Sequence, residues 1–297
     1  GTPRVSSRCR FKMSLGPVGL SAYYFTYDNW GANPSATPGT AVTPGASNAE
    51  GTFTQVASSA NIAQDCYWMH VKISGGATSA QAKPQIFDIG VDPAGGTSYT
   101  AVISNISCGA SPAFTAAGTV EYLFPIFIKA GSSVAIRVQG TNATAGTVRA
   151  VCKWWGQPSM PEAVPVGSIF QTFGTITGSS GPTFTPGNAA DGTWVDLGAT
   201  TSELWWWQLS YHINNATITA EYTYIDIAYG DGSNKIIISR DMHVGTTGET
   251  NGMGMNTGLL ACSAFKPVPS GANIYVRGRC LNAPDSTYPA TVIGCGG

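Results

Sequence analysis

A stretch of about 15 residues occurs twice in this chain and constrains its fold more than any other feature. The sequence FPIFIKAGSSVAIRVQ runs from Phe124 to Gln139, and FKPVPSGANIYVRGR runs from Phe265 to Arg279, about 140 residues further on. Each copy has an apolar entry, a turn with a glycine, an alternating strand and an arginine. Such internal similarity predicts one structural unit used twice.

Three further stretches recur in the same order, which extends the repeat over both halves of the chain. They are residues 43–53 with 185–194, 67–73 with 205–211, and 85–91 with 224–229. The apolar runs are short, alternate with polar residues and end at Gly, Pro, Asn, Ser or Thr, and no sustained 3.6-residue period is present. This pattern is typical of a protein built from many short β-strands.

We therefore predict an all-β fold of two tandem β-sandwich, jelly-roll-like domains related by internal duplication, with an immunoglobulin-like sandwich as the alternative. The length of 297 residues fits two domains. The sequence GQPSMPEAVPVG reads as a stiff linker because it contains three prolines. The expected parts are an N-terminal arm at 1–20, a first sandwich at 21–156, the linker at 157–167 and a second sandwich at 168–297.

The charge pattern indicates burial against other subunits. Charged residues make up 10% of the chain, against roughly 25% in an ordinary soluble domain, so a free monomer would have a sticky surface. We expect much of that surface to be buried against other subunits. The net charge of −1 gives no reason to expect nucleic acid or membrane as a partner, and no run of 18 apolar residues indicates a transmembrane helix.

Candidate interface residues come from the arm and from the polar faces of two equivalent strands. The arm is basic, and the two strands each place a tryptophan and a histidine opposite their core-facing residues, which suggests packing against a partner. The candidates are Arg4, Arg8, Arg10, Trp68, His70, Trp206 and His212.

No spacing of residues in this chain indicates catalysis, a cofactor or a metal site. The motifs of zinc sites, phosphate-binding loops, dinucleotide-binding folds and nucleophile elbows are all missing, so we expect a protein that is not an enzyme. The seven cysteines are expected to be buried free thiols, because none forms a C-x-x-C pair and their number is odd.

Two acidic residues at equivalent positions are better explained by structure than by catalysis. Asp88 and Asp226 occupy the same place in the two repeats, as do Arg137 and Arg277. We predict an Asp–Arg contact in each half or across the halves. We expect it to fix the strand register more than to add stability, since exposed pairs contribute only about 0–1 kcal/mol.

The paired motif resembles one found in structural proteins of tailed bacteriophages. Residues 127–137 have the form "apolar-I-x-A-G-[ST]-x-[IV]-A-x-R", and residues 267–277 are their counterpart. This motif resembles one in auxiliary virion proteins, such as capsid cement or decoration proteins, head fibres and tail parts. The resemblance implies a virion-bound homo-oligomer, with a trimer as one possibility, that is assembled in the host cytoplasm and binds capsid or tail subunits. It brings no catalytic residues with it.

The first functional hypothesis is therefore a non-enzymatic virion protein, a capsid cement or decoration protein that stabilises a phage head. One alternative is a carbohydrate-binding fibre or tail-tip module, since exposed tryptophans stack on sugar rings. Another is a small double-jelly-roll major capsid protein, and a glycoside hydrolase would need a pair of carboxylates facing a cleft.

Overall fold

The computed structural model describes residues 26–30, 39–77, 85–108, 119–140, 145–156, 167–177, 181–211, 221–246, 262–281 and 287–297. All regular secondary structure in these ranges is β-strand, so the all-β prediction is confirmed. The described residues include no helix long and apolar enough to cross a membrane.

The first half of the chain folds into two sheets. One has the strand order β1-β9-β4-β7, with β2 paired to β9, and the other has the order β3-β8-β5-β6. The strands are β1 (Thr26–Trp30), β2 (Thr40–Val42), β3 (Thr54–Ala57), β4 (Cys66–Ala77), β5 (Gln85–Asp92), β6 (Thr100–Cys108), β7 (Thr119–Phe124), β8 (Ser133–Gly140) and β9 (Ala145–Gly156).

The second half repeats this arrangement. Its sheets have the orders β10-β19-β14-β17, with β11 on β19, and β12-β18-β15-β16, with β13 on β18. The strands are β10 (Ile169–Phe173), β11 (Thr183–Phe184), β12 (Gly187–Asn188), β13 (Val195–Ala199), β14 (Leu204–Tyr211), β15 (Glu221–Gly230), β16 (Lys235–Thr246), β17 (Cys262–Val268), β18 (Asn273–Cys280) and β19 (Tyr288–Gly296).

The two strand orders are the same when the strands are matched in chain order. Strands β1, β3, β4, β5, β6, β7, β8 and β9 correspond to β10, β13, β14, β15, β16, β17, β18 and β19. Eight antiparallel strands in two facing four-stranded sheets, connected in this order, form a jelly roll. The chain is therefore two jelly rolls in tandem, which we call the first roll and the second roll, and the expected fold class is confirmed.

The core of each roll is formed by alternate side chains of facing sheets. In the first roll Val71 of β4, Ile89 of β5 and Ile136 of β8 are fully buried in one cluster, and Leu209, Ile227 and Val276 are their counterparts in the second roll. Strict alternation along these strands sends the intervening residues to the outer faces.

The repeated sequence motif enters β8 and β18 through equivalent tight turns. Gly131 and Gly271 have φ values of 79° and 84° in these turns, a region that glycine adopts without strain. A Cβ atom at either position would meet no atom within 4 Å. The backbone angle, and not a lack of space, therefore accounts for the glycine in both copies.

The described cysteines are buried and are not joined by disulfide bonds. Cys66, Cys108, Cys152, Cys280 and Cys295 form no disulfide. Burial raises the pKa of Cys152 and of Cys295 to about 12, and the pKa of Cys108 further still. A thiol reacts through its thiolate, so these groups are protected both by burial and by their protonation.

We expect a thiol reagent such as Ellman's reagent to modify at most two of the seven cysteines in the folded protein and all seven in guanidinium chloride. The two are Cys9 and Cys262, whose side chains lie outside the described part. Rapid modification of more than two thiols in the folded state would contradict the burial of the other five.

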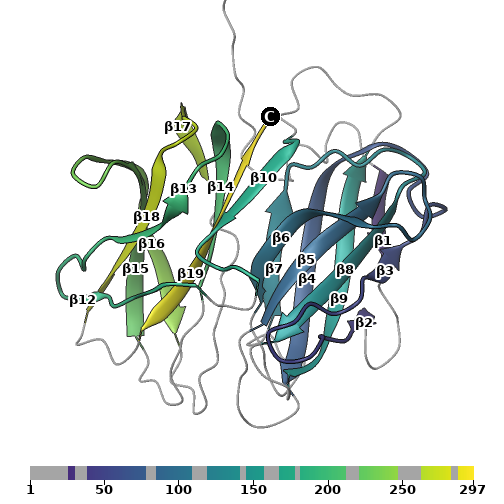
Figure 1. Cartoon of the computed structure of the whole chain (residues 1–297), viewed down its shortest axis with the longest axis horizontal. Helices are drawn as coiled ribbons and strands as arrows, with labels where there is room; N and C mark the ends of the chain where they lie inside the picture. The colour runs from purple at the N-terminus through teal and green to yellow at the C-terminus, as the bar shows by residue number, and fades with distance from the viewer. Residues whose placement is uncertain are drawn as a thin grey trace, which may run out of the picture.

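The two rolls lie side by side and pack through unlike surfaces (Figure 1). Strand β6, at one edge of the first roll, contacts β10, β14 and β19 of the second. Phe170 of β10 and Ile293 of β19 lie on the outer face of their own sheet and join the core cluster of the first roll. An edge of the first roll is thus docked on a sheet face of the second.

Candidate functional site

A charged cluster occupies the outer face of β5 and β8 in the first roll. Asp88 and Arg137 are directly opposite in the register of these strands. The Nε and Nη2 atoms of Arg137 both lie 2.7 Å from Oδ2 of Asp88, and Nη1 lies 2.6 Å from a carboxylate oxygen of Glu50. One guanidinium group thereby joins two carboxylates.

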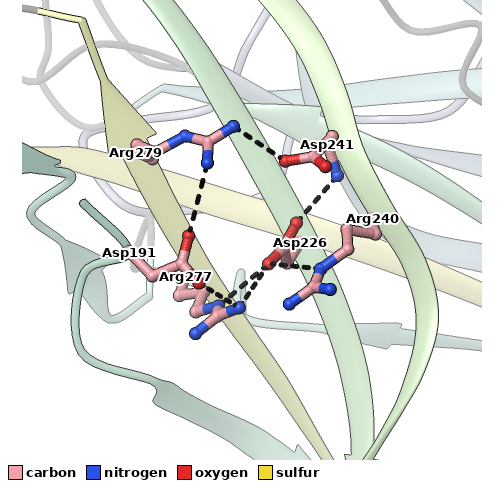
Figure 2. A network of polar contacts seen from close by, with 6 residues as sticks. All are labelled: Asp191, Asp226, Arg240, Asp241, Arg277 and Arg279. Carbon is pink, nitrogen blue, oxygen red and sulfur yellow. Dashed lines mark hydrogen bonds and ion pairs between the residues drawn. The ribbon is translucent and has the colours of Figure 1, made fainter. Parts of the chain in front are cut away.

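The second roll contains the same cluster (Figure 2). Asp226 and Arg277 face each other on β15 and β18, with Nε and Nη2 of Arg277 at 2.9 Å and 2.8 Å from Oδ2 of Asp226. Asp191 takes the place of Glu50, at 2.6 Å from Nη2. The structure therefore brings both predicted Asp–Arg pairs together, each within its own roll.

The aspartate of each pair is buried and the arginine is partly buried, contrary to the expectation that the pairs would be exposed. Asp88 and Asp226 are only 3% and 4% exposed. The repeated loops 43–53 and 185–194 fold over them, and the guanidinium groups of Arg137 and Arg277 lie 4.6 Å and 4.4 Å from the ring centres of Phe53 and Trp194. Removing one partner of a buried pair is far more costly than breaking an exposed one.

Each buried aspartate also holds a kink in the neighbouring edge strand. Its Oδ1 atom accepts the backbone N–H of Asn105 at 2.7 Å in the first roll and of Asp241 at 2.8 Å in the second. Both donors have positive φ, 58° and 53°, and both lie where the register of the strand pair shifts. Sequence reasoning missed this role, although Asn and Asp are the side chains that tolerate such a backbone.

The cluster of the second roll carries more charge than that of the first. Arg279 donates to Asp241 at 3.0 Å and lies over the ring of Tyr224, and Arg240 lies 4.0 Å from Asp226. In the first roll the positions of Arg240 and Asp241 are held by Ser104 and Asn105. Each of the six charged groups of the second cluster pairs with an oppositely charged group of the same cluster (Figure 2).

The two predicted interface tryptophans contact each other instead of another protein. The rings of Trp68 in β4 and Trp206 in β14 are 5.4 Å apart in an edge-to-face arrangement, and Trp68 is only 7% exposed. They pack with Tyr67, Leu123 and Trp155 where the two rolls meet. The expectation that these two rings face an external partner is therefore wrong, because each of them packs against the other half of the chain.

An amide side chain links the rolls next to this aromatic contact. Gln208 of β14 is fully buried and bonds both backbone groups of Leu123, accepting from its N–H at 3.1 Å and donating to its carbonyl. Strand β7 is the edge of its sheet, so these two groups point away from β4 and have no strand to pair with. The side-chain amide of Gln208 therefore supplies the two hydrogen bonds that a neighbouring strand would otherwise make to Leu123.

Two threonines of the second roll bond the kinked strand of the first. Thr172 donates its hydroxyl to the carbonyl of Ser104 at 2.6 Å, and Thr175 donates to the carbonyl of Asn105. Nothing in the sequence pattern marks Gln208, Thr172 or Thr175, since uncharged polar residues on an outer face are normally solvated.

His70 lies on the outer face of the first roll, in a charged environment. Its Nε2 atom is 3.1 Å from Glu121 of β7, whose other oxygen accepts from Lys72 at 2.6 Å. Burial lowers the pKa of His70 more than Glu121 raises it, and Lys153 and Lys72 also lower it. The imidazole is therefore held neutral near pH 7.

This shift makes part of the folding stability depend on pH. The unfolded chain binds a proton on His70 near pH 6.5, while the folded chain binds it only at a lower pH, so stability is lost as the pH falls between these two values. We expect the loss of melting temperature between about pH 7.5 and about pH 5.5 to be smaller in His70→Gln, which carries the residue found at the equivalent position 208. An equal loss in both proteins would contradict this.

The remaining predicted interface residues lie outside the described part of the chain. These are Arg4, Arg8 and Arg10 of the arm, and His212. Residues 157–166 of the expected linker are also outside it, while Gly167 forms a parallel bridge with Ile126.

Among the described residues, no group of three or more His, Cys, Asp or Glu side chains is arranged to hold a metal ion. The carboxylates of the two clusters are taken up by arginines and backbone N–H groups. The clusters can therefore hold the covering loops and the edge strands in place. The same cluster occurs in both rolls, as expected for a structural role.

Comparisons with known proteins find similarity only at the level of structure. No family model matches the chain, and no curated protein matches its sequence. The atomic structure of Sulfolobus turreted icosahedral virus includes a similar chain, with 10% identity, coverage of 92% of this chain and 90% of that one, and a TM-score of 0.40. The major capsid protein P2 of bacteriophage PM2 is similar at 10% identity, with 92% and 98% coverage and a TM-score of 0.34.

The same comparison corrects the expectation that the chain is not an enzyme. PNGase F, a glycosylasparaginase from Flavobacterium meningosepticum, is similar at 10% identity, with 91% and 96% coverage and a TM-score of 0.35. The chain also spans 65% of the length of PNGF-II. An enzyme is thus found among the similar structures. None of these likenesses by itself assigns a function.

Proposed function

We propose that the chain is a structural subunit of a viral particle, and specifically a shell-forming capsid protein with two jelly rolls. The observation that supports this is the strand order, which is the same in both rolls and is an order used by viral capsid domains. The proposal is an analogy at the level of the fold and needs support from the surfaces of the molecule.

The packing of the rolls provides that support. The contact buries uncharged groups such as Phe170, Ile293 and Gln208, and the joined pair forms one building block. Charged residues are only 10% of the chain, so the remaining surface suits lateral contacts with further subunits better than it suits a free monomer. The partners would be virion subunits, including copies of the chain itself, and the location would be the virion, after assembly in the host cytoplasm.

A capsid cement or decoration protein of a tailed phage is the second candidate. It is favoured by the basic N-terminal sequence, since Arg4, Arg8, Arg10 and Lys12 supply positive charge for binding to a finished shell. The glycan-binding alternative loses its main support, because Trp68 and Trp206 cover each other and present no ring pair to a sugar.

The test is to locate and count the chain in intact particles. Antibodies raised against the purified chain should label the outside of particles that carry its gene, and quantitative mass spectrometry should find it as the most abundant particle protein. A decoration protein would be accompanied by a more abundant shell protein. Absence of the chain from purified particles would overturn the proposal in both forms.

A further inference from the structure

Strand β16 is an edge strand of the second roll with an uncovered apolar surface. Ile236 is 57% exposed and Ile237 is 39% exposed, and both lie beside the turn that begins the strand. Edge strands of this kind readily associate with other chains unless something covers them. The uncovered edge therefore needs an explanation.

The middle of the equivalent edge of the first roll, around Ser104 and Asn105, is covered by the second roll. Strand β6 corresponds to β16, and it lies against β10, β14 and β19. Two hydrogen bonds mark the contact, from Thr172 and Thr175 to the carbonyls of Ser104 and Asn105. The corresponding positions on β16 are Arg240 and Asp241, with exposed side chains. The chain thus contains one covered and one uncovered copy of the same edge.

The covering face also exists in two copies. The registers of β4 with β9 and of β14 with β19 place His70 at the position of Gln208, and Lys153 at the position of Ile293. In the same way Lys72 corresponds to Ser210, and Val151 to Thr291. The first roll therefore carries the counterpart of the face that the second roll uses for docking.

We propose that a second copy of this chain covers β16 with the outer face of its first roll, formed by β1, β9 and β4. The contact between chains then repeats the contact within the chain, so that every edge meets a face. This inference rests on the proposed function for its biological setting, because a shell needs such lateral contacts.

The covered and the uncovered surfaces differ in charge. The edge and the face that meet within the chain are uncharged at the compared positions, with Ser104, Asn105, Ser210 and Ile293. Their uncovered counterparts carry Arg240, Asp241, Lys72 and Lys153, charges of both signs. Surfaces that must stay soluble before they meet need such groups.

The proposed contact is head-to-tail, because an edge meets a face and neither meets its own kind. Head-to-tail contacts propagate until they close into a ring or continue as an open array. A two-fold symmetric contact would instead stop at a dimer. This difference separates the proposal from other ways of covering β16.

Two variants each remove one side of the contact. The double replacement Ile236→Glu with Ile237→Glu changes only the uncovered edge. Val151→Glu changes only the face, and the new carboxylate lies directly opposite Lys72 in the strand register, which favours folding. Leu281→Glu is the matched control, because Leu281 is an exposed apolar residue, 55% exposed, that lies on neither surface.

The masses of the full-length proteins are measured by sedimentation velocity at several concentrations and two salt concentrations, after circular dichroism has shown that each variant melts cooperatively. We expect the unmodified chain and Leu281→Glu to form assemblies larger than a dimer. We expect the edge variant and the face variant to be monomers when alone. Mixed together, they should form a dimer and nothing larger, since only one intact edge and one intact face remain in the pair.

The proposal is overturned if the unmodified chain is a monomer at all concentrations, if either variant assembles alone, or if the mixture forms no dimer. Self-association is measured without other viral components, so it is independent of the particle test. If the chain associates in this way but is absent from particles, the proposed contact stands and the proposed function is wrong. If the chain is found in particles but the mixed variants form no dimer, the proposed function stands and the proposed contact is wrong.

Discussion

Asp226→Ala is expected to lower the free energy of unfolding by about 3–5 kcal/mol, the cost of removing one partner of a buried ion pair. Arg277 would keep only Asp191, and the N–H of Asp241 would lose its acceptor. The charge on Arg277 would then remain under the ring of Trp194 with less compensation. Urea denaturation followed by tryptophan fluorescence measures the change.

Two comparisons make this prediction specific. Asp88→Ala should cost about the same, because the first roll holds Arg137, Glu50 and the N–H of Asn105 in the same arrangement. Arg240→Ala should cost at most about 1 kcal/mol, because its side chain is largely exposed and lies 4.0 Å from Asp226. A loss in Asp226→Ala no larger than in Arg240→Ala would show that the cluster does not hold the strands.

Gln208→Leu is expected to be the second most destabilising change, at about 2–4 kcal/mol, since it leaves both backbone groups of Leu123 buried without a partner. The leucine fills nearly the same volume, so the loss reports on the hydrogen bonds more than on packing. Urea denaturation gives the stability. Hydrogen exchange gives a local readout, because the Leu123 amide should exchange slowly in the unmodified chain and much faster in the variant.

The matched control is His70→Leu, which makes the same kind of change at the equivalent position of the first roll. His70 bonds only the partly exposed Glu121, so its loss should cost about 0–1 kcal/mol. The Leu123 amide should remain protected in this control. Equal protection of that amide in Gln208→Leu and in the unmodified chain would contradict the proposed link between the rolls.

The repeat in the sequence was enough to predict the fold class and the Asp–Arg pair at the centre of each cluster. Equivalent apolar residues such as Ile136 and Val276 gave the core faces, and equivalent polar residues such as Asp88 and Asp226 lay on the opposite faces. Alternation fixes the face of a residue once a strand is known. The opposed arginines then followed from the same register.

The burial of the clusters could not be predicted, because it depends on loops that fold back over the sheet. The sequence of 43–53 shows that Phe53 is repeated as Trp194, but not that each ring lies on an arginine. The same limit explains the error about Trp68 and Trp206. An outward tryptophan in each repeat looked like two external contacts, whereas the unlike packing of the rolls brings the two rings together.

The unlike packing also could not be read from a repeat of nearly equal halves. A duplicated unit suggests a symmetric pair, in which each roll uses the same surface. The chain instead uses the edge of one roll and the face of the other, and the signal lies in single replacements such as Lys153 by Ile293 and His70 by Gln208. These replacements are recognisable only when the strand registers are known.

The most direct test of the proposed assembly is a cryo-electron microscopy map of the assembled chain at a resolution that separates strands. We expect β16 of each subunit to lie under β4 and β9 of the next subunit, in the same relation that β6 has to β14 and β19 within one subunit. A map in which β16 is uncovered, or pairs with β16 of a neighbour, would contradict this arrangement.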